Sequence, residues 1–318
     1  MTSGVAARDS VFLTVYSVTF LLGLPANLLV LAVFVRKVQK RGATPNVVYA
    51  LNLCTANLVL VVWLPVKAAE ILLETWALPE PLCPAYSFFL FASLYGSCLM
   101  LTAMSVGRYL SIAFPISYKM YRRAQLSCCI SAGLWALVLL HLSLALVAEE
   151  NVYFVSTRPH DNSSACYENF TPEQLKVLLP LRLEMAILLF LLPLVITATC
   201  TLRCLMLVQR SSLSLGRKKR VLAVALSTFV VFVVCYSPYN LSHVVGFVQG
   251  RNVSWRQEAM LSSSCNVFLQ PVVMLLLSPG PPRCLRARLC GRQAPGLGLF
   301  CQTLISQQRL SSSSDKQT

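Results

Sequence analysis

The sequence predicts an all-α membrane protein, a bundle of seven transmembrane helices with its N-terminus outside and its C-terminus in the cytoplasm. Three observations predict this fold class. Of the 318 residues, 56% are apolar and only 12% are charged, whereas about a quarter of the residues in a soluble domain are charged. Apolar stretches long enough to cross about 30 Å of hydrocarbon recur along the chain. Basic residues concentrate in alternate connections between them. A soluble enzyme and a disordered chain are therefore excluded.

Each apolar window is interpreted as one span. The predicted spans cover residues 11–35, 46–74, 84–113, 125–148, 177–208, 219–248 and 257–278. The chain then divides into an extracellular N-terminus at 1–10, the seven-helix bundle at 11–278 and a cytoplasmic tail at 279–318. Prolines inside spans predict kinks that neighbouring helices must support. These are Pro25, Pro65, Pro193, Pro238 and Pro271.

The orientation follows from the basic residues. They gather in the connections at 36–41, 119–123 and 210–220, in the tail, and at the helix ends marked by Arg108 and Arg203. Together these positions hold 20 of the 27 basic residues but only one of the 12 acidic residues. Because basic loops stay in the cytoplasm, this side is predicted to face inward. The net charge of +15 therefore indicates topology and attraction to anionic membrane lipid, with no nucleic acid as partner.

Cysteines and sequons agree with this orientation. Cys83 starts the third span and Cys166 lies in the second outer loop, so this pair in the oxidising compartment predicts a disulfide. Cysteines inside the spans are expected to be small packing residues. Asn-X-Ser/Thr sequons on the predicted outside are candidate glycosylation sites. They begin at Asn162, Asn169 and Asn252.

Seven spans in this orientation fit a G-protein-coupled receptor, a light-driven retinal pump or a transporter. The last span contains no Lys for a retinal Schiff base, and no Asp or Glu lies deep in a span, as an ion-coupled carrier would require. The chain resembles the rhodopsin-like receptors over essentially its whole length. The residues that carry this resemblance are Asn27, Cys83, Arg108, Tyr109, Trp135, Pro193, Pro238 and Pro271.

Within that class the chain resembles the free fatty acid receptors. Residues 166–171, 179–184 and 238–246 are similar to the short-chain acid receptor, whereas 49–53 and 107–110 are more similar to the medium- and long-chain receptor. The resemblance implies a plasma-membrane receptor that binds a fatty acid outside and couples to a heterotrimeric G protein inside, with no cofactor and no enzymatic activity. Short-chain acids are the first expectation and medium-chain acids the alternative. Arrestin or a related receptor are further candidate partners.

Polar residues collect at the outer ends of spans four to seven. Arg182 precedes Pro193 by about 16 Å of helix at a rise of about 1.5 Å per residue, which predicts a position just below the outer surface. Arg256 opens the seventh span. A guanidinium matches a carboxylate in two hydrogen bonds. A lone arginine at a helix end can instead extend to the lipid headgroups, so both interpretations stand on sequence alone.

The resemblance implies a ligand site made by residues from several helices. Its members are Arg182 and Arg256 on the carboxylate, assisted by His243, Tyr239 and His141. Glu168 and Glu184 are predicted to hold the arginines when no ligand is bound. Phe91 stands where the short-chain receptor has Tyr, so the preferred acid can shift.

Four residues are predicted to form the signalling switch. Arg108 lacks the usual acidic neighbour because residue 107 is Gly, and Asn57 replaces the usual sodium-binding Asp. Pro238 kinks the sixth span, and Gln270 stands where Asn or Asp is usual. These changes can raise basal signalling or weaken the active form. A receptor-like partner that signals weakly or not at all is therefore the second hypothesis, and a carboxylate transporter the third.

Overall fold

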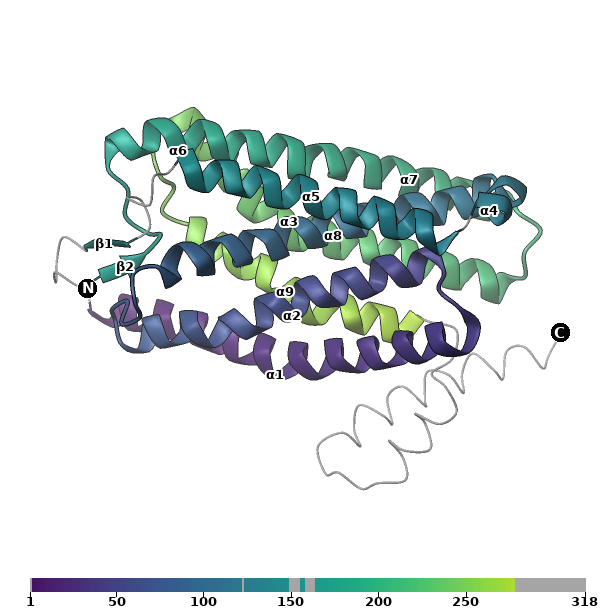
Figure 1. Ribbon diagram of the computed structural model, residues 1–318, viewed down its shortest axis with the longest axis horizontal. Helices are drawn as coiled ribbons and strands as arrows, with labels where there is room; N and C mark the ends of the chain where they lie inside the picture. The colour runs from purple at the N-terminus through teal and green to yellow at the C-terminus, as the bar shows by residue number, and fades with distance from the viewer. Residues whose placement is uncertain (1, 122, 149–154, 158–163, 278–318) are drawn as a thin grey trace, which may run out of the picture.

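A computed structural model of the protein describes residues 2–121, 123–148, 155–157 and 164–277. Long helices run side by side along one axis (Figure 1). The N-terminus and a small hairpin lie at one end of the bundle, and the short helix α4 lies at the other. The predicted fold class, an all-α bundle of transmembrane helices, is confirmed.

The helices match the seven predicted spans. Their bounds are α1 Thr2–Arg41, α2 Pro45–Leu72, α3 Leu82–Ala113, α4 Pro115–Tyr121, α5 Ala124–Ala148, α6 Pro172–Met185, α7 Leu192–Arg210, α8 Leu215–Gln249 and α9 Arg256–Leu277. A π-helical stretch, η1 Ala186–Leu191, joins α6 to α7 as one span. Within the described residues, six stretches are long and apolar enough to cross a membrane. The helix of the seventh predicted span is α9, which carries several polar residues, among them Asn266 and Gln270.

Two helices, α1 and α6, begin five or more residues earlier than the hydropathy predicts. α1 begins at Thr2 instead of near residue 11. Its extension carries Arg8, whose Nε lies 2.7 Å from a carboxylate oxygen of Glu258 on α9. α6 begins at Pro172 because Thr171 and Gln174 form a reciprocal capping box and proline suits the first helical turn. Polar first turns stay helical through caps and ion pairs, which a hydropathy window does not detect.

The predicted proline kinks fall inside continuous helices, and hydrogen bonds from α9 reach the α8 backbone near Pro238. Pro238 interrupts the hydrogen bonding of α8, and the nearby carbonyl of Cys235 accepts hydrogen bonds from Ser263 Oγ at 2.8 Å and Ser262 Oγ at 3.2 Å. These serines belong to α9, so a neighbouring helix supplies hydrogen-bond donors to the α8 backbone beside the proline. Pro193 directly follows the π-helical stretch, a common site of helix bending.

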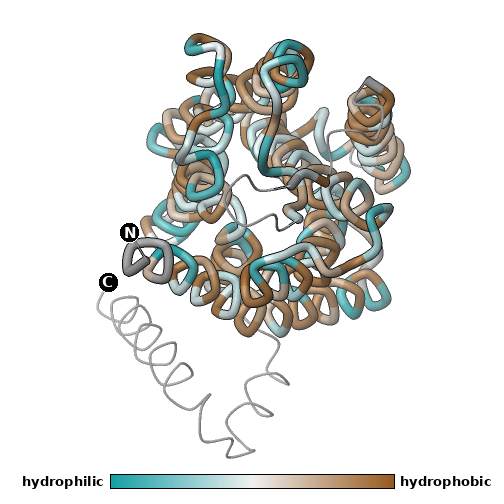
Figure 2. The backbone as a smooth tube through the Cα atoms, turned by 90° about the vertical axis from the view of Figure 1, so that its left-hand side faces the viewer, coloured by the Kyte–Doolittle hydropathy of each residue, from teal (hydrophilic) through white to brown (hydrophobic). Residues whose placement is uncertain are grey.

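The bundle is apolar inside and outside. α3 is its most buried helix, and the core around Tyr95, Met100 and Leu101 packs against Phe232 and Tyr236 of α8. Large apolar side chains are also exposed on the outer helices, such as those at 126, 140 and 147 on α5. Figure 2, an end-on view, shows hydrophobic residues recurring around the helices of the bundle. An apolar outer surface is what a lipid environment requires.

A two-stranded hairpin lies at the end of the bundle that also holds the N-terminus (Figure 1). β1 (Val155–Thr157) pairs antiparallel with β2 (Ser164–Cys166). A disulfide joins Cys166 to Cys83 at the start of α3, so the predicted pairing is confirmed. The backbone N–H of Trp76 also donates to the carbonyl of Ser164 at 2.7 Å. The chain that follows β2 is thereby held over the helix ends.

Candidate functional site

The two arginines predicted for the ligand site are buried inside the bundle. Arg182 lies on α6 and is 2% exposed, and Arg256 is the first residue of α9 and is 6% exposed. A side chain that extends to the headgroups would leave its charged end accessible. Burial therefore favours an internal role for both guanidinium groups.

Both guanidinium groups pack on the same two aromatic rings. The Arg182 guanidinium carbon lies 4.7 Å from the ring centre of Phe170 and 5.5 Å from that of Tyr167. The corresponding distances for Arg256 are 5.7 Å and 5.8 Å. Such cation–π contacts stabilise a cation removed from water. Tyr167 and Phe170 follow β2, so the disulfide-linked loop brings the two cations together.

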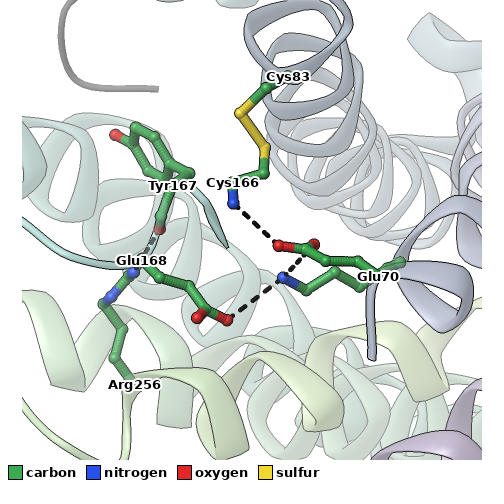
Figure 3. Close-up of a disulfide and its surroundings, with 7 residues drawn as sticks. Glu70, Cys83, Cys166, Tyr167, Glu168 and Arg256 are labelled. Carbon is green, nitrogen blue, oxygen red and sulfur yellow. Dashed lines mark hydrogen bonds and ion pairs between the residues drawn. A yellow bond between two sulfur atoms is a disulfide. The ribbon is translucent and has the colours of Figure 1, made fainter. Parts of the chain in front are cut away.

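Each guanidinium donates one hydrogen bond to a neutral oxygen. Arg182 Nη1 donates to Asn252 Oδ1 at 3.2 Å, and Arg256 Nη2 donates to the carbonyl of Tyr167 at 3.1 Å (Figure 3). Arg182 Nη2 and Arg256 Nε are buried and have no hydrogen-bond partner among the described residues. Neither arginine forms an ion pair with an acidic side chain in that part of the chain. Buried cations with unused donors favour an anionic guest.

Two of the three predicted assisting residues lie with the arginines. Tyr239 and His243 are buried one turn apart on α8, with ring centres 4.5 Å apart. Tyr239 lines the same small cavity as Arg256. His243 Nδ1 is buried with no hydrogen-bond partner in the described part of the chain.

His141 is separate from this group. It is half-buried on α5, and no contact among the described residues joins it to Arg182 or Arg256. Its Nε2 atom is buried and has no hydrogen-bond partner there. Glu184 is exposed on α6 and also stands apart from the two arginines.

Glu168 contacts Lys67, a residue that the sequence pattern does not single out. Its Oε1 lies 3.5 Å from Lys67 Nζ and accepts a hydrogen bond from Gln257 Nε2 at 2.7 Å. Lys67 also pairs with Glu70 at 2.8 Å, and Glu70 Oε1 accepts from the backbone N–H of Cys166 at 2.9 Å (Figure 3). Lys67 and Glu70 are one helical turn apart near the C-terminal end of α2. That spacing is the signal that could have identified the pair.

A small cavity of about 50 Å³ lies beside Arg256. It has room for a few water molecules, since each needs roughly 10–15 Å³ by this measure. Five helices and the segment after β2 contribute to its wall. The wall includes Tyr16, Lys67, Tyr86, Phe91, Tyr239 and Arg256. The cavity thus combines aromatic surface with two cationic side chains.

The predicted switch residues lie deeper in the bundle. Asn57 Nδ2 donates to Asn27 Oδ1 at 3.1 Å, and Asn57 Oδ1 accepts from Asn266 Nδ2 at 3.3 Å and from Ser97 Oγ at 3.4 Å. Gln270 is buried one turn beyond Asn266, and both its amide atoms have no hydrogen-bond partner in the described chain. A neutral amide cluster therefore links α1, α2, α3 and α9.

Arg108 and Pro238 complete the predicted switch set. Arg108 is half-buried near the C-terminal end of α3 and forms no ion pair with the acidic side chains that the structure describes. This agrees with the absence of an acidic neighbour at residue 107. Pro238 lies in α8 one residue before Tyr239 of the ligand site. The kink and the site therefore share one segment of α8.

The candidate glycosylation sites have different surroundings. Asn169 is exposed. Asn252 is half-buried and its amide is engaged, because Oδ1 accepts from Arg182 and Nδ2 donates to the carbonyl of Glu168 at 3.5 Å. Asn162 lies outside the described residues.

Comparison with known proteins agrees with this architecture. The model of the 7 transmembrane receptor (rhodopsin family) matches residues 26–275. Free fatty acid receptor 3 of Homo sapiens is 39% identical over 270 residues, covering 84% of this chain and 76% of that protein. Free fatty acid receptor 1 of Mesocricetus auratus is 38% identical over 288 residues, covering 87% and 95%. Free fatty acid receptor 2 of Mus musculus is 36% identical over 275 residues, covering 85% and 82%. The chain therefore belongs to the rhodopsin family of seven-transmembrane receptors, within its free fatty acid receptor group.

Proposed function

We propose that this chain is a G-protein-coupled receptor for free fatty acids, with short-chain carboxylates as its ligands. As a member of its family it is a multi-pass plasma-membrane protein and not an enzyme. One observation carries the ligand proposal. Arg182 and Arg256 are buried on the same pair of rings, and each keeps a donor without a partner among the described residues. The names of the relatives, which include free fatty acid receptors 2 and 3, support it.

In this proposal a carboxylate accepts paired hydrogen bonds from both guanidinium groups, each of which keeps one unused donor, Arg182 Nη2 and Arg256 Nε. Charge-assisted bonds of this kind are about twice as strong as neutral ones. Tyr239 and His243 lie beside the guanidinium groups and supply further polar contacts. The hydrocarbon tail enters the neighbouring cavity along Phe91.

The size of the cavity supports a short acid. At about 50 Å³ it holds a few water molecules, and a long alkyl chain would require the surrounding helices to separate. A five-atom acid such as propionate gains at most roughly 7 kcal/mol, at about 1.5 kcal/mol per heavy atom. We therefore expect activity at concentrations from tens of micromolar to millimolar.

The test is a dose series of C2 to C12 acids on surface-expressed receptor, read as cAMP and calcium. Arg182→Ala and Arg256→Ala should each reduce potency at least about 30-fold, the low end for truncating one partner of a buried charge pair. Arg251→Ala is the matched control, because Arg251 is exposed and its Nε bonds Gln249. Unchanged potency in both buried variants would refute the ligand site. Concentrative uptake of labelled acid without a second messenger would indicate a transporter.

A weakly signalling or non-signalling receptor-like partner is the second candidate. The amide cluster around Asn57 and the unpaired state of Arg108 in the described chain favour it, because both depart from the usual switch. It predicts carboxylate binding without a change in cAMP or calcium. Binding of labelled acid, measured beside the second messengers, separates the two candidates.

We also propose the orientation, with the N-terminus outside and the tail from residue 279 inside. The basic start of α8, at residues 217–220, then faces anionic lipid and the G protein, and arrestin is a further candidate partner on that side. Antibody should label an N-terminal tag on intact cells and a C-terminal tag only after permeabilisation. The reverse pattern would invert the proposed topology.

A further inference from the structure

Arg182 and Arg256 each donate a hydrogen bond to a neutral oxygen, and the two oxygens come from different connecting segments. For Arg256 the oxygen is the main-chain carbonyl of Tyr167, after β2. For Arg182 it is the side-chain amide oxygen of Asn252, in the turn between α8 and α9. Both oxygens lie where a carboxylate oxygen of the proposed ligand would compete for guanidinium donors.

The turn that carries Asn252 is held at both sides. Gly250 ends α8 with a φ of 63°, which glycine adopts without steric cost. The backbone N–H of Arg251 donates to the carbonyl of Gly246 at 3.1 Å, and that of Arg256 donates to the carbonyl of Val253 at 3.2 Å. Asn252 is therefore presented to the site by a fixed turn.

The orientation of the Asn252 amide follows from its two partners. Its Nδ2 faces the carbonyl of Glu168, which only accepts, and its Oδ1 faces Arg182, which only donates. In a flipped amide, Nδ2 would face the donor Arg182 and Oδ1 would face the carbonyl oxygen of Glu168, so neither hydrogen bond could form. Asn252 thus joins Arg182 to the segment after β2 as a neutral acceptor.

Tyr167 reaches its position through an unusual backbone conformation. Its φ is 58°, in the left-handed region, which costs a residue with a side chain about 1–2 kcal/mol. Its neighbours fix this conformation: Cys166 through the disulfide and the bond from its N–H to Glu70, and Glu168 through Lys67 and Gln257. The result is a carbonyl that points at Arg256 (Figure 3).

We propose that Asn252 Oδ1 and the Tyr167 carbonyl are internal stand-ins for the ligand carboxylate, one on each arginine, and that Asn252 sets ligand affinity through Arg182. This inference rests on the proposed function. Neutral acceptors lower the cost of burying two unpaired cations, and a carboxylate displaces them because its bonds to guanidinium are stronger. The stand-ins reduce apparent affinity, since the ligand must compete with a contact already made.

Three substitutions test the stand-in on Arg182. Asn252→Ala removes the competing oxygen and should increase potency about tenfold, as expected for a hydrogen bond to a charged group. Asn252→Asp places a permanent carboxylate on Arg182 and should decrease potency at least about tenfold. Ser254→Ala is the matched control, because it removes the Asn252 sequon and leaves the amide in place. Ser254 is exposed, and we expect wild-type potency from this variant.

The readouts are the potency of a C2 to C6 acid series and the glycan-dependent gel mobility of each receptor. We expect a higher potency in Asn252→Ala and a lower potency in Asn252→Asp. Ser254→Ala should be unchanged in both potency and mobility. A potency loss in Asn252→Ala, or equal potency in all three variants, would overturn the stand-in while leaving the proposed function intact. A glycan on Asn252, lost in Ser254→Ala, would also overturn it, because the glycosylated nitrogen faces Glu168. A wild-type receptor that responds to no acid overturns both.

Discussion

Four buried charged residues lie at the end of the bundle that carries the β-hairpin. Whether each has a charged partner in the described chain distinguishes a structural role from ligand binding. Lys67 and Glu70 are 7% and 3% exposed and lie 2.8 Å apart, so each charge is compensated within the chain. Arg182 and Arg256 are equally buried but have only neutral acceptors among the described residues. A buried charge needs a partner, and the second pair is therefore where an external anion is expected.

Glu70→Gln should strongly destabilise the receptor. It removes the carboxylate closest to the buried Lys67 ammonium, and breaking a buried ion pair costs about 3–5 kcal/mol. We expect a large fall in melting temperature of the purified receptor in detergent. Glu258→Gln is the matched control. Its partner Arg8 and Glu258 itself have side chains that are 48% and 43% exposed, and exposed pairs contribute about 0–1 kcal/mol. Equal shifts for both variants would contradict this interpretation.

The sequence identified side chains on helices better than side chains on connections. The structure brings together four of the helix residues that the family resemblance implies, Arg182, Arg256, Tyr239 and His243. His141 and Glu184, also on helices, stand apart. The contacts of Asn252 depend on a turn conformation and a disulfide-held loop, so hydropathy and spacing gave no means of placing its amide on Arg182. From sequence alone, Asn252 is predicted only as a glycosylation site.

At the scale of elements, one glycine allows α3 and α5 to approach closely. A Cβ atom on Gly96 would lie 2.7 Å and 2.8 Å from two ring carbons of Trp135. The indole is not free to move away, because its Nε1 donates to Asn52 Oδ1 on α2 at 3.0 Å. Three helices therefore meet around a ring that requires glycine opposite it.

Gly96→Ala should destabilise this contact by about 1–3 kcal/mol, the usual cost of overpacking a core. The measurement is the thermal melting of the purified receptor. Gly133→Ala on α5 is the control, because no atom lies within 4 Å of its added Cβ. It should melt at or slightly above the wild-type temperature, since alanine favours the helix over glycine. A Gly96→Ala variant as stable as Gly133→Ala would show that the helices can separate at little cost.

Element boundaries show what a hydropathy pattern omits. The seven spans were predictable because about 20 apolar residues must cross the hydrocarbon. The polar first turns of α1 and α6 were not, because they depend on the contact of Arg8 with Glu258 and on the cap at Thr171. The Thr-Pro-Glu-Gln sequence at 171–174 is a readable capping signal that a hydropathy window does not use.

At the scale of the whole molecule, polar contacts join the helices in the middle of the bundle. Tyr95 on α3 donates to Asn240 on α8 at 3.4 Å, and the amide cluster around Asn57 joins α1, α2, α3 and α9. Ligand binding must change how these helices pack for a G protein to respond. Because the amide cluster contacts α1, α2, α3 and α9 together, a rearrangement of this cluster would change the packing of four helices at once.

Basal signalling should therefore be independent of sodium in the wild type and become sodium-dependent in Asn57→Asp. The neutral Asn57 amide lies among Asn27, Ser97 and Asn266 and offers a cation little attraction. Aspartate at the same position adds a buried charge that a sodium ion can compensate, surrounded by oxygen-bearing side chains. The measurement is basal second-messenger output in sodium and in an equimolar organic cation, at matched surface expression. We expect a several-fold decrease by sodium in Asn57→Asp alone. Equal output in all four conditions would mean that the amide cluster does not control the resting state through charge.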